Sequence, residues 1–257
     1  MEKQIRGLSV TVPEILYREM AESLALVPEN ANAALLIRHS IRYPIPPGDF
    51  GNDIPLTPEG ILLAEEWGRK LDRHVGRIFS SPVGRCVETG RAVLRGIGQN
   101  ERTVHTDTAL SEAFIRDENA AGPVFMKHGP IRVINRLLRN IPIPGMVPVE
   151  QGVRRVMTFM FANLSDTPCL NLHITHDGIL APVLCHLMGR DATDEESWPR
   201  MLEGAFFWYE EPELFLSWRG TRWNISRELF QRIRNKQFAE GDQGDEQNDF
   251  IRNNQTV

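Results

Sequence analysis

The chain has 257 residues, of which 41% are hydrophobic and 25% charged, an ordinary composition for a globular protein with a sizeable core. Its formal net charge of −5 argues against a general nucleic-acid or membrane-surface binder, so any anion site must be a local cationic pocket. No apolar run is long enough to span a membrane, and residues 1–13 lack the apolar segment of a secretion signal. Together with three cysteines that suit buried thiols, this predicts a cytoplasmic protein.

Strands and helices are predicted to alternate along most of the chain. Short apolar runs predict buried strands over residues 34–37, 75–79, 103–106 and 169–174. Helical spacing and start signals predict helices over residues 13–26, 57–71, 83–97, 130–139, 149–164 and 177–187. Three antiparallel strands are predicted at the sheet edge, over residues 206–210, 214–218 and 221–225. This order predicts an α/β fold.

A single domain is predicted over residues 1–238. Within it, residues 107–167 have a looser pattern with interspersed Gly, Pro and Asn, which predicts a cap-like insertion over the crevice of the sheet. A last helix, over residues 226–238, precedes a polar tail. That tail, residues 239–257, lacks a periodic apolar face and is predicted to be disordered or loosely attached.

Cationic and titratable side chains follow three of the predicted strands. They are Arg38, His39 and Arg42 after the first strand, Arg85 after the second, and His176 and Asp177 after the strand at 169–174. Parallel strands place these ends on one edge of the sheet, where open α/β folds bind ligands. The planar fork of arginine fits phosphate. Arg85 lies in the first turn of the helix predicted over residues 83–97, where a cation opposes the helix dipole at a cost of roughly 0.3–1 kcal/mol, and a bound anion would offset that cost. The pattern therefore predicts a phosphate site.

His39 is the candidate nucleophile of this site. Nearby arginines are expected to lower its pKa by like charge, which leaves a neutral imidazole able to attack a bound phosphoryl group. A metal pair made of His173 and His176 is rejected, because residues three apart on a strand point to opposite faces. No cofactor is predicted, and His173 is expected to lie in the core.

The stretch Arg38-His39-Ser40-Ile41-Arg42-Tyr43-Pro44 resembles the Arg-His-Gly-x-Arg-x-Pro signature of the histidine phosphatase superfamily. Three further segments resemble the family's helix start, its Ser-x-x-x-x-Arg segment and its second-histidine motif, namely Leu56–Gly60, Ser80–Arg85 and Thr175–Asp177. Order and spacing agree over residues 32–190. The resemblance implies a three-layer α/β/α sandwich with a mostly parallel central sheet, like that of phosphoglycerate mutases.

The resemblance also implies a metal-independent phosphatase that hydrolyses phosphomonoesters through a phosphohistidine intermediate on His39. The phosphate oxygens would be held by Arg38, Arg42, Arg85 and His176. A small phosphorylated substrate is the expected partner, with its selectivity set by residues 43–55 and 107–167. A mutase-type phosphotransferase stays open. So does a catalytically weak phosphoester-binding relative, because Ser40 stands where the family has glycine.

Two residues are candidates for the acid that protonates the leaving group. The His176-Asp177 pair resembles the acid phosphatase and phytase branch, in which the Asp is the donor. Leu110-Ser111-Glu112 resembles the Leu-x-Glu of the phosphoglycerate-mutase-like branch, in which the Glu is the donor. We place Asp177 first and keep Glu112.

Overall fold

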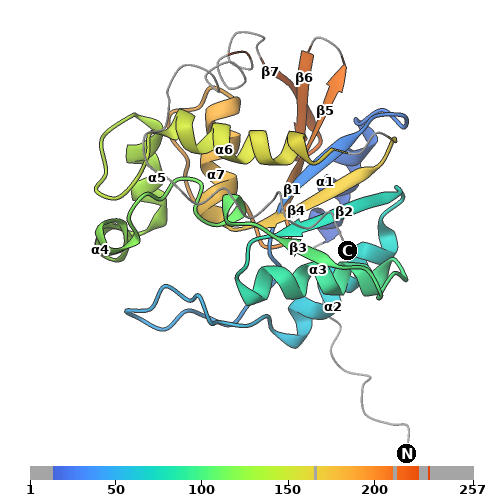
Figure 1. Cartoon of the computed structure of the whole chain (residues 1–257), viewed down its shortest axis with the longest axis horizontal. Coiled ribbons are helices and arrows are strands. Elements are labelled where there is room, and N and C mark those ends of the chain that lie inside the picture. The colour runs from blue at the N-terminus through green and yellow to red at the C-terminus, as the bar shows by residue number, and fades with distance from the viewer. Residues whose placement is uncertain (1–13, 165–166, 211–212, 226–230, 232–257) are drawn as a thin grey trace, which may run out of the picture.

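The computed structural model describes residues 14–164, 167–210, 213–225 and 231. Its helices are α1 (Glu14–Ala25), α2 (Pro58–Lys70), α3 (Gly84–Gly96), α4 (Glu118–His128), α5 (Pro130–Leu138), α6 (Val149–Ala162) and α7 (Asp177–Leu187), with a 3-10 turn at Thr108–Leu110. Its strands are β1 (Ala33–Arg38), β2 (Val75–Ser80), β3 (Val104–Thr106), β4 (Leu170–Thr175), β5 (Gly204–Glu210), β6 (Glu213–Trp218) and β7 (Thr221–Ile225) (Figure 1). The tail 239–257 lies outside the described residues, as does the predicted last helix apart from residue 231.

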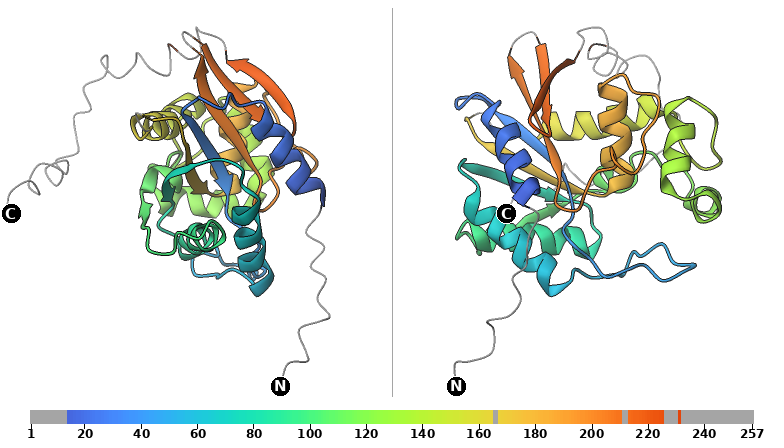
Figure 2. Two further views of the ribbon diagram at one scale, coloured as in Figure 1. Left: turned by 90° about the vertical axis from the view of Figure 1, so that its right-hand side faces the viewer. Right: turned by 180° about the vertical axis from the view of Figure 1, so that it is seen from behind.

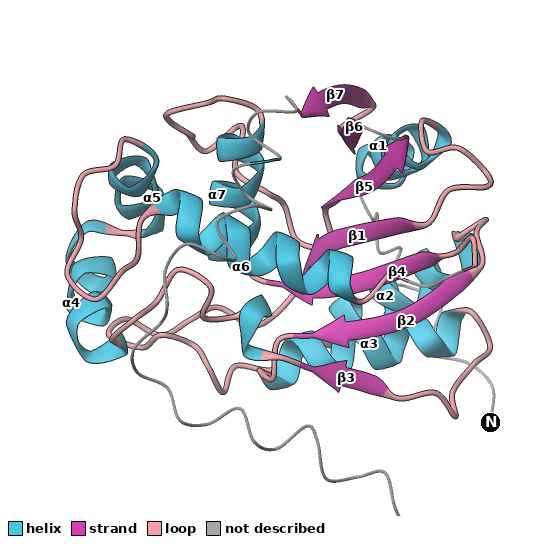
Figure 3. Ribbon diagram, turned by 45° about the horizontal axis from the view of Figure 1, so that its top comes forward, coloured by secondary structure: helices cyan, strands magenta, loops and turns pink. Residues whose placement is uncertain are grey.

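The strands form one sheet in the order β3-β2-β4-β1-β5-β6-β7. The first four strands are parallel, and β5, β6 and β7 are antiparallel at one edge, as predicted. Helices α1, α2 and α3 pack on one face, and α6 and α7 pack on the other (Figure 3). The predicted three-layer α/β/α sandwich is confirmed. Within the described residues no helix is long and apolar enough to cross a bilayer.

Strand β1 is buried on both faces, which explains why its sequence does not alternate with polar residues. Leu36 belongs to the core beneath α6 and α7, whereas Leu35 and Ile37 belong to the core beneath α1, α2 and α3. Each of these side chains is at most 1% exposed. Burying one of them contributes about 1.5–3 kcal/mol, so the hydrophobic effect fixes β1 in the centre of the sheet.

The carboxyl ends of β1, β2 and β4 meet at one edge of the sheet. Arg38 is in register with Thr175, and Ser80 is in register with Ile174. The chain enters β5 antiparallel to β1, with Gly204 opposite Ile37. Residues just before β5 therefore lie beside the end of β1, next to the candidate nucleophile His39.

The segment 107–167 contains structures of two kinds. Helix α6 packs against α7 within the sandwich. Helix α5 also packs against α7, but together with α4 it lies to the side of the sheet that the loop between β1 and α2 also reaches (Figures 1 and 2). The ring of Phe50 in that loop packs on Gly122 of α4, where an added Cβ would lie 2.8 Å from the ring. Helix α4 was not predicted, because Gly122 and Pro123 are poor helix formers inside it.

Candidate active site

The His39 ring is held at both nitrogens. Nδ1 lies 2.8 Å from the carbonyl oxygen of Ser40, and since a carbonyl only accepts, Nδ1 carries the proton. Nε2 accepts a hydrogen bond from Nε of Arg85 at 3.0 Å. Burial, followed by the neighbouring His176, lowers the pKa of His39 well below its usual value. The imidazole is therefore neutral with its lone pair on Nε2, and burial contributes more to this than the like charge that the sequence suggested.

Arg85 joins the two histidines from the first turn of α3. Its Nη2 donates to Nδ1 of His176 at 3.1 Å, and the His39 and His176 rings lie 5.5 Å apart. Because Nδ1 of His176 accepts, its Nε2 carries the proton and donates to the Ser81 hydroxyl at 2.9 Å. Burial, then Arg85, lowers the pKa of His176 to about 3. A third Arg85 nitrogen donates to the Gly51 carbonyl in the loop after β1.

Arg38 and Asp177 form an ion pair beside these histidines. Nη2 of Arg38 lies 2.6 Å from Oδ2 of Asp177, and Nη1 donates to the Pro199 carbonyl at 2.7 Å. The Asp177 carboxylate also accepts from the indole N–H of Trp198 at 3.2 Å and from the backbone N–H of Gly178 at 2.9 Å. Burial alone would raise the pKa of Asp177, but Arg38 and Trp198 outweigh it and lower that pKa. The carboxylate is therefore ionised, and both of its oxygens already accept hydrogen bonds.

A cleft of about 470 Å³ opens at this edge of the sheet. The predicted site residues that line it are His39, Arg42, Arg85, Glu112, His176 and Asp177. Arg38 is 8% exposed and lies outside that lining. The Glu112 side chain is exposed in the cleft wall. Apolar side chains complete the wall, among them Ile45 and Phe50 from the loop after β1 and Ile115, Phe125 and Met146 from the segment 107–167.

Ser40, the departure from the family signature, fits its position without strain. Its hydroxyl donates to the Gly60 carbonyl at 2.7 Å, and its N–H donates to the Thr89 hydroxyl at 3.1 Å. Ser40 is not among the described non-glycine residues that have a positive φ. Helix α2 approaches the same backbone closely, since a Cβ on Gly60 would lie 2.0 Å from the Ile41 carbonyl oxygen. The hydroxyl of Ser40 thus binds the start of α2.

Helix α3 begins at Gly84, one residue after the predicted start. Its N-cap is Val83, whose side chain makes no capping bond. The Ser81 hydroxyl accepts from the Val83 N–H at 3.2 Å and also contacts His176, so it supports the site. Sequence reasoning missed Trp198, because this residue reaches Asp177 only through tertiary structure and carries no local signal.

Two expectations about buried residues are confirmed. His173 is 0% exposed, and its ring stacks on Phe79 with centroids 5.2 Å apart. Burial lowers the pKa of His173 to about 3. All three cysteines are free and buried.

The sequence model of the histidine phosphatase superfamily (branch 1) matches residues 48–202, more than half of the chain. The chain belongs to this superfamily. The match begins after His39 and contains Arg85, Glu112, His176 and Asp177. No curated protein matches the sequence.

Solved structures of similar fold include several phosphatases. Phosphoserine phosphatase from Entamoeba histolytica, in complex with 3-phosphoglyceric acid, is 16% identical with a TM-score of 0.51, over 77% of this chain and 98% of that one. A mycobacterial glucosyl-3-phosphoglycerate phosphatase in complex with VO3 is 16% identical with a TM-score of 0.50, over 74% of this chain and 100% of that one. Phosphoglycerate mutase from Bacillus anthracis is 17% identical with a TM-score of 0.48, over 81% and 99%. At these identities, the solved structures show that this member of the superfamily shares their fold, and they show nothing about its substrate.

Proposed function

We propose that this member of the histidine phosphatase superfamily hydrolyses phosphomonoesters, without a metal ion, through a phosphohistidine on His39. The observation that carries the proposal is the state of His39. Its proton is fixed on Nδ1 by the Ser40 carbonyl, and its Nε2 lone pair faces the Arg85 guanidinium in the cleft. A neutral imidazole with a directed lone pair beside cationic donors is the arrangement that attack on phosphorus requires.

In the first step, Nε2 of His39 attacks the phosphorus atom in line, and the ester P–O bond breaks. The nitrogens of Arg85 that now bond to the two histidines would donate to phosphate oxygens, as would Arg42 from the cleft wall. A dianionic phosphate would also raise the pKa of His176, so that its ring becomes a charged donor. The buried Nε–H of Arg38 has no hydrogen-bond partner among the described residues, and a phosphate oxygen would supply one.

Glu112 is the donor that we propose for the leaving oxygen. Asp177 is ionised and already accepts from Arg38, Trp198 and Gly178, so protonating it would break its ion pair. Glu112 is exposed in the wall of the same cleft, and its Leu-x-Glu segment resembles that of the phosphoglycerate-mutase-like branch, in which the Glu is the donor. Asp177 then serves to hold Arg38 in place.

In the second step, Glu112 as carboxylate takes a proton from water, and the water oxygen attacks phosphorus. The P–N bond to His39 breaks, inorganic phosphate leaves, and the neutral imidazole is restored. The phosphoryl group thus passes from ester to histidine to water.

Hydrolysis of para-nitrophenyl phosphate in the presence of EDTA tests this proposal. Wild type should release nitrophenol and inorganic phosphate with or without EDTA, and His39→Ala should lose at least about 100-fold in rate. His74→Ala is the matched control, because His74 is exposed and lies outside the cleft. Inhibition by EDTA, retained activity in His39→Ala, or transfer to an added alcohol without release of inorganic phosphate would overturn it.

A further inference from the structure

The segment immediately before β5, residues 196–203, runs beside the backbone of the candidate nucleophile. The N–H of Arg38 donates to the Glu203 carbonyl at 2.9 Å, and the N–H of Leu202 donates to the His39 carbonyl at 3.1 Å. These two bonds continue the antiparallel pairing of β1 with β5 past the end of the sheet. The position of His39 therefore depends on the position of this segment, which we call the pre-β5 segment.

The pre-β5 segment also contacts the ion pair of the site. The Pro199 carbonyl accepts from Nη1 of Arg38 at 2.7 Å, and the Trp198 indole donates to Asp177 at 3.2 Å. Arg38 and Asp177 thus each have one partner in the segment in addition to each other. Moving the segment would withdraw an acceptor from the arginine and a donor from the carboxylate at the same time.

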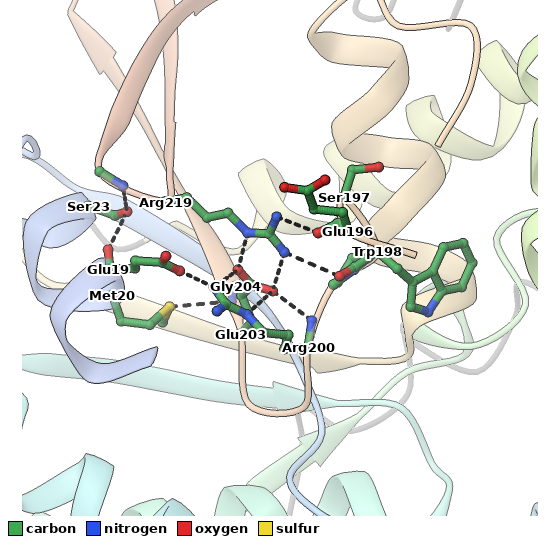
Figure 4. A network of polar contacts seen from close by, with 12 residues as sticks. Glu19, Met20, Ser23, Glu196, Ser197, Trp198, Arg200, Glu203, Gly204 and Arg219 are labelled. Atoms are coloured by element: carbon green, nitrogen blue, oxygen red, sulfur yellow. Dashed lines mark hydrogen bonds and ion pairs between the residues drawn. The ribbon is translucent and has the colours of Figure 1, made fainter. Parts of the chain in front are cut away.

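An ion pair whose carboxylate is buried holds the pre-β5 segment in place (Figure 4). The Glu203 side chain, 2% exposed, accepts from Nε of Arg219 at 2.6 Å and from Nη2 at 3.1 Å. Arg219 also donates to the carbonyls of Glu196 at 2.9 Å and Trp198 at 3.2 Å. The backbone N–H of Arg200 donates to Glu203 at 2.6 Å. Burial alone would raise the pKa of Glu203, but Arg219 and Arg200 outweigh it and lower that pKa, so the carboxylate is ionised.

Two stretches of backbone beside this ion pair have a positive φ. Arg219 (φ 49°) and Gly220 (φ 67°) are the two central residues of the turn between β6 and β7, and a two-residue hairpin turn takes this conformation. Leu202, next to Glu203, has a φ of 59°, in the left-handed region that side chains usually avoid, and such a residue persists where its surroundings determine it strongly. A buried ion pair contributes little net stability compared with apolar residues of the same volume. Its specific effect here is to fix where the pre-β5 segment lies.

We infer that Glu203 and Arg219 are positioning residues of the phosphate site. Neither lines the cleft, and both act by fixing Trp198 and Pro199, which in turn orient Asp177 and Arg38. The part of this inference that concerns phosphate rests on the proposed function. The part that concerns the orientation of Trp198 and Arg38 does not.

Arg219→Met and the conservative Arg219→Lys test the inference by two measurements. The first is the indole N–H signal of Trp198 in ¹⁵N–¹H spectra, assigned with Trp198→Phe; Arg219→Met should shift it and speed its exchange with water. The second is the dissociation constant of vanadate, which should rise about 10- to 100-fold, because a misplacement of 1 Å can cost about 100-fold. Arg222→Met is the matched control, since Arg222 stacks on Phe215 at 3.9 Å, away from the site, and should change neither.

A double-mutant cycle separates positioning from a general loss of stability. If Arg219 acts through Arg38, then Arg219→Met should weaken vanadate binding much less in an Arg38→Lys background than in wild type. Glu203→Gln should cause the same shift of the Trp198 indole signal. If Arg219→Met does not fold, Glu203→Gln and Arg219→Lys are measured in its place. An unmoved indole signal, or losses that multiply independently, would overturn the inference. If wild type neither binds vanadate nor hydrolyses phosphomonoesters, the proposed function fails, and the indole signal still decides the positioning.

Discussion

Glu112→Gln and Asp177→Asn should fail in different ways, and the structure sets the size of each effect. Asp177→Asn removes the partner of Arg38, whose side chain is 9% exposed, and breaking a buried pair costs about 3–5 kcal/mol. Because the Asp177 side chain is 28% exposed, we expect a loss near the lower end, about 3 kcal/mol of unfolding free energy. The Glu112 side chain is exposed, so Glu112→Gln should change stability by less than about 0.5 kcal/mol.

The catalytic effects should differ in their dependence on the leaving group. Loss of a general acid lowers the rate about 10²- to 10⁴-fold, and this applies to an alkyl ester whose alkoxide must be protonated. A nitrophenyl ester needs little protonation, so Glu112→Gln should reduce its hydrolysis far less. Asp177→Asn disturbs Arg38 and should reduce kcat/KM for both esters by a similar factor.

The assay compares kcat/KM for an alkyl and a nitrophenyl phosphate in both variants, with urea unfolding as the measure of stability. Glu112→Asp offers a control that keeps the carboxyl group. A leaving-group-dependent loss in Asp177→Asn, combined with equal losses in Glu112→Gln, would refute the assignment and restore Asp177 as the donor.

Three further predictions concern the support of the site and its response to pH. Ser40→Gly should lower the unfolding free energy by about 1–2 kcal/mol, because it removes a buried hydrogen bond and adds backbone freedom to the unfolded chain. Enzyme assays of Ser40→Gly should show no gain in activity, and a higher activity would mean that the serine impairs the site. Gly60→Ala should cost at least about 1–3 kcal/mol in urea unfolding, since its Cβ would meet the Ile41 carbonyl, whereas Gly84→Ala has open space and should cost nothing. The folded pKa of His173, about 3, lies below its ordinary 6.5, so between those values the unfolded chain binds an extra proton and stability falls as pH falls. His173→Phe should therefore reduce the slope of unfolding free energy against pH by about 1.4 kcal/mol per unit between about pH 4 and 6, and an unchanged slope would contradict this.

Local patterns predicted the α/β fold and the edge at which the site lies, and the family resemblance added the three-layer sandwich. Apolar runs such as that of β1 end where charged residues begin, and parallel pairing then brings Arg38, Arg85 and His176 to one edge. The position of α2 was equally readable, since Thr57 caps it through the Gly60 N–H at 3.0 Å.

The rest depends on contacts between distant parts of the chain. Trp198 reaches Asp177, and Arg219 reaches Glu203, only after β5 has paired with β1, and none of the four side chains has a local signal of that role. The engagement of Asp177 with Arg38 was hidden for the same reason. The resemblance of the His176-Asp177 pair suggests that Asp177 is a proton donor, and its ion pair with Arg38 is the reason why we propose it as an anchor for the arginine instead.

Trapping the phosphoenzyme tests the central claim most directly. The protein is mixed with a ³²P-labelled phosphomonoester, quenched in base within milliseconds to seconds, and digested for mapping. A phosphohistidine intermediate predicts a label that is stable in base and labile in acid, located on His39 and absent from His39→Ala. A label on another residue, or rapid turnover by His39→Ala, would contradict it.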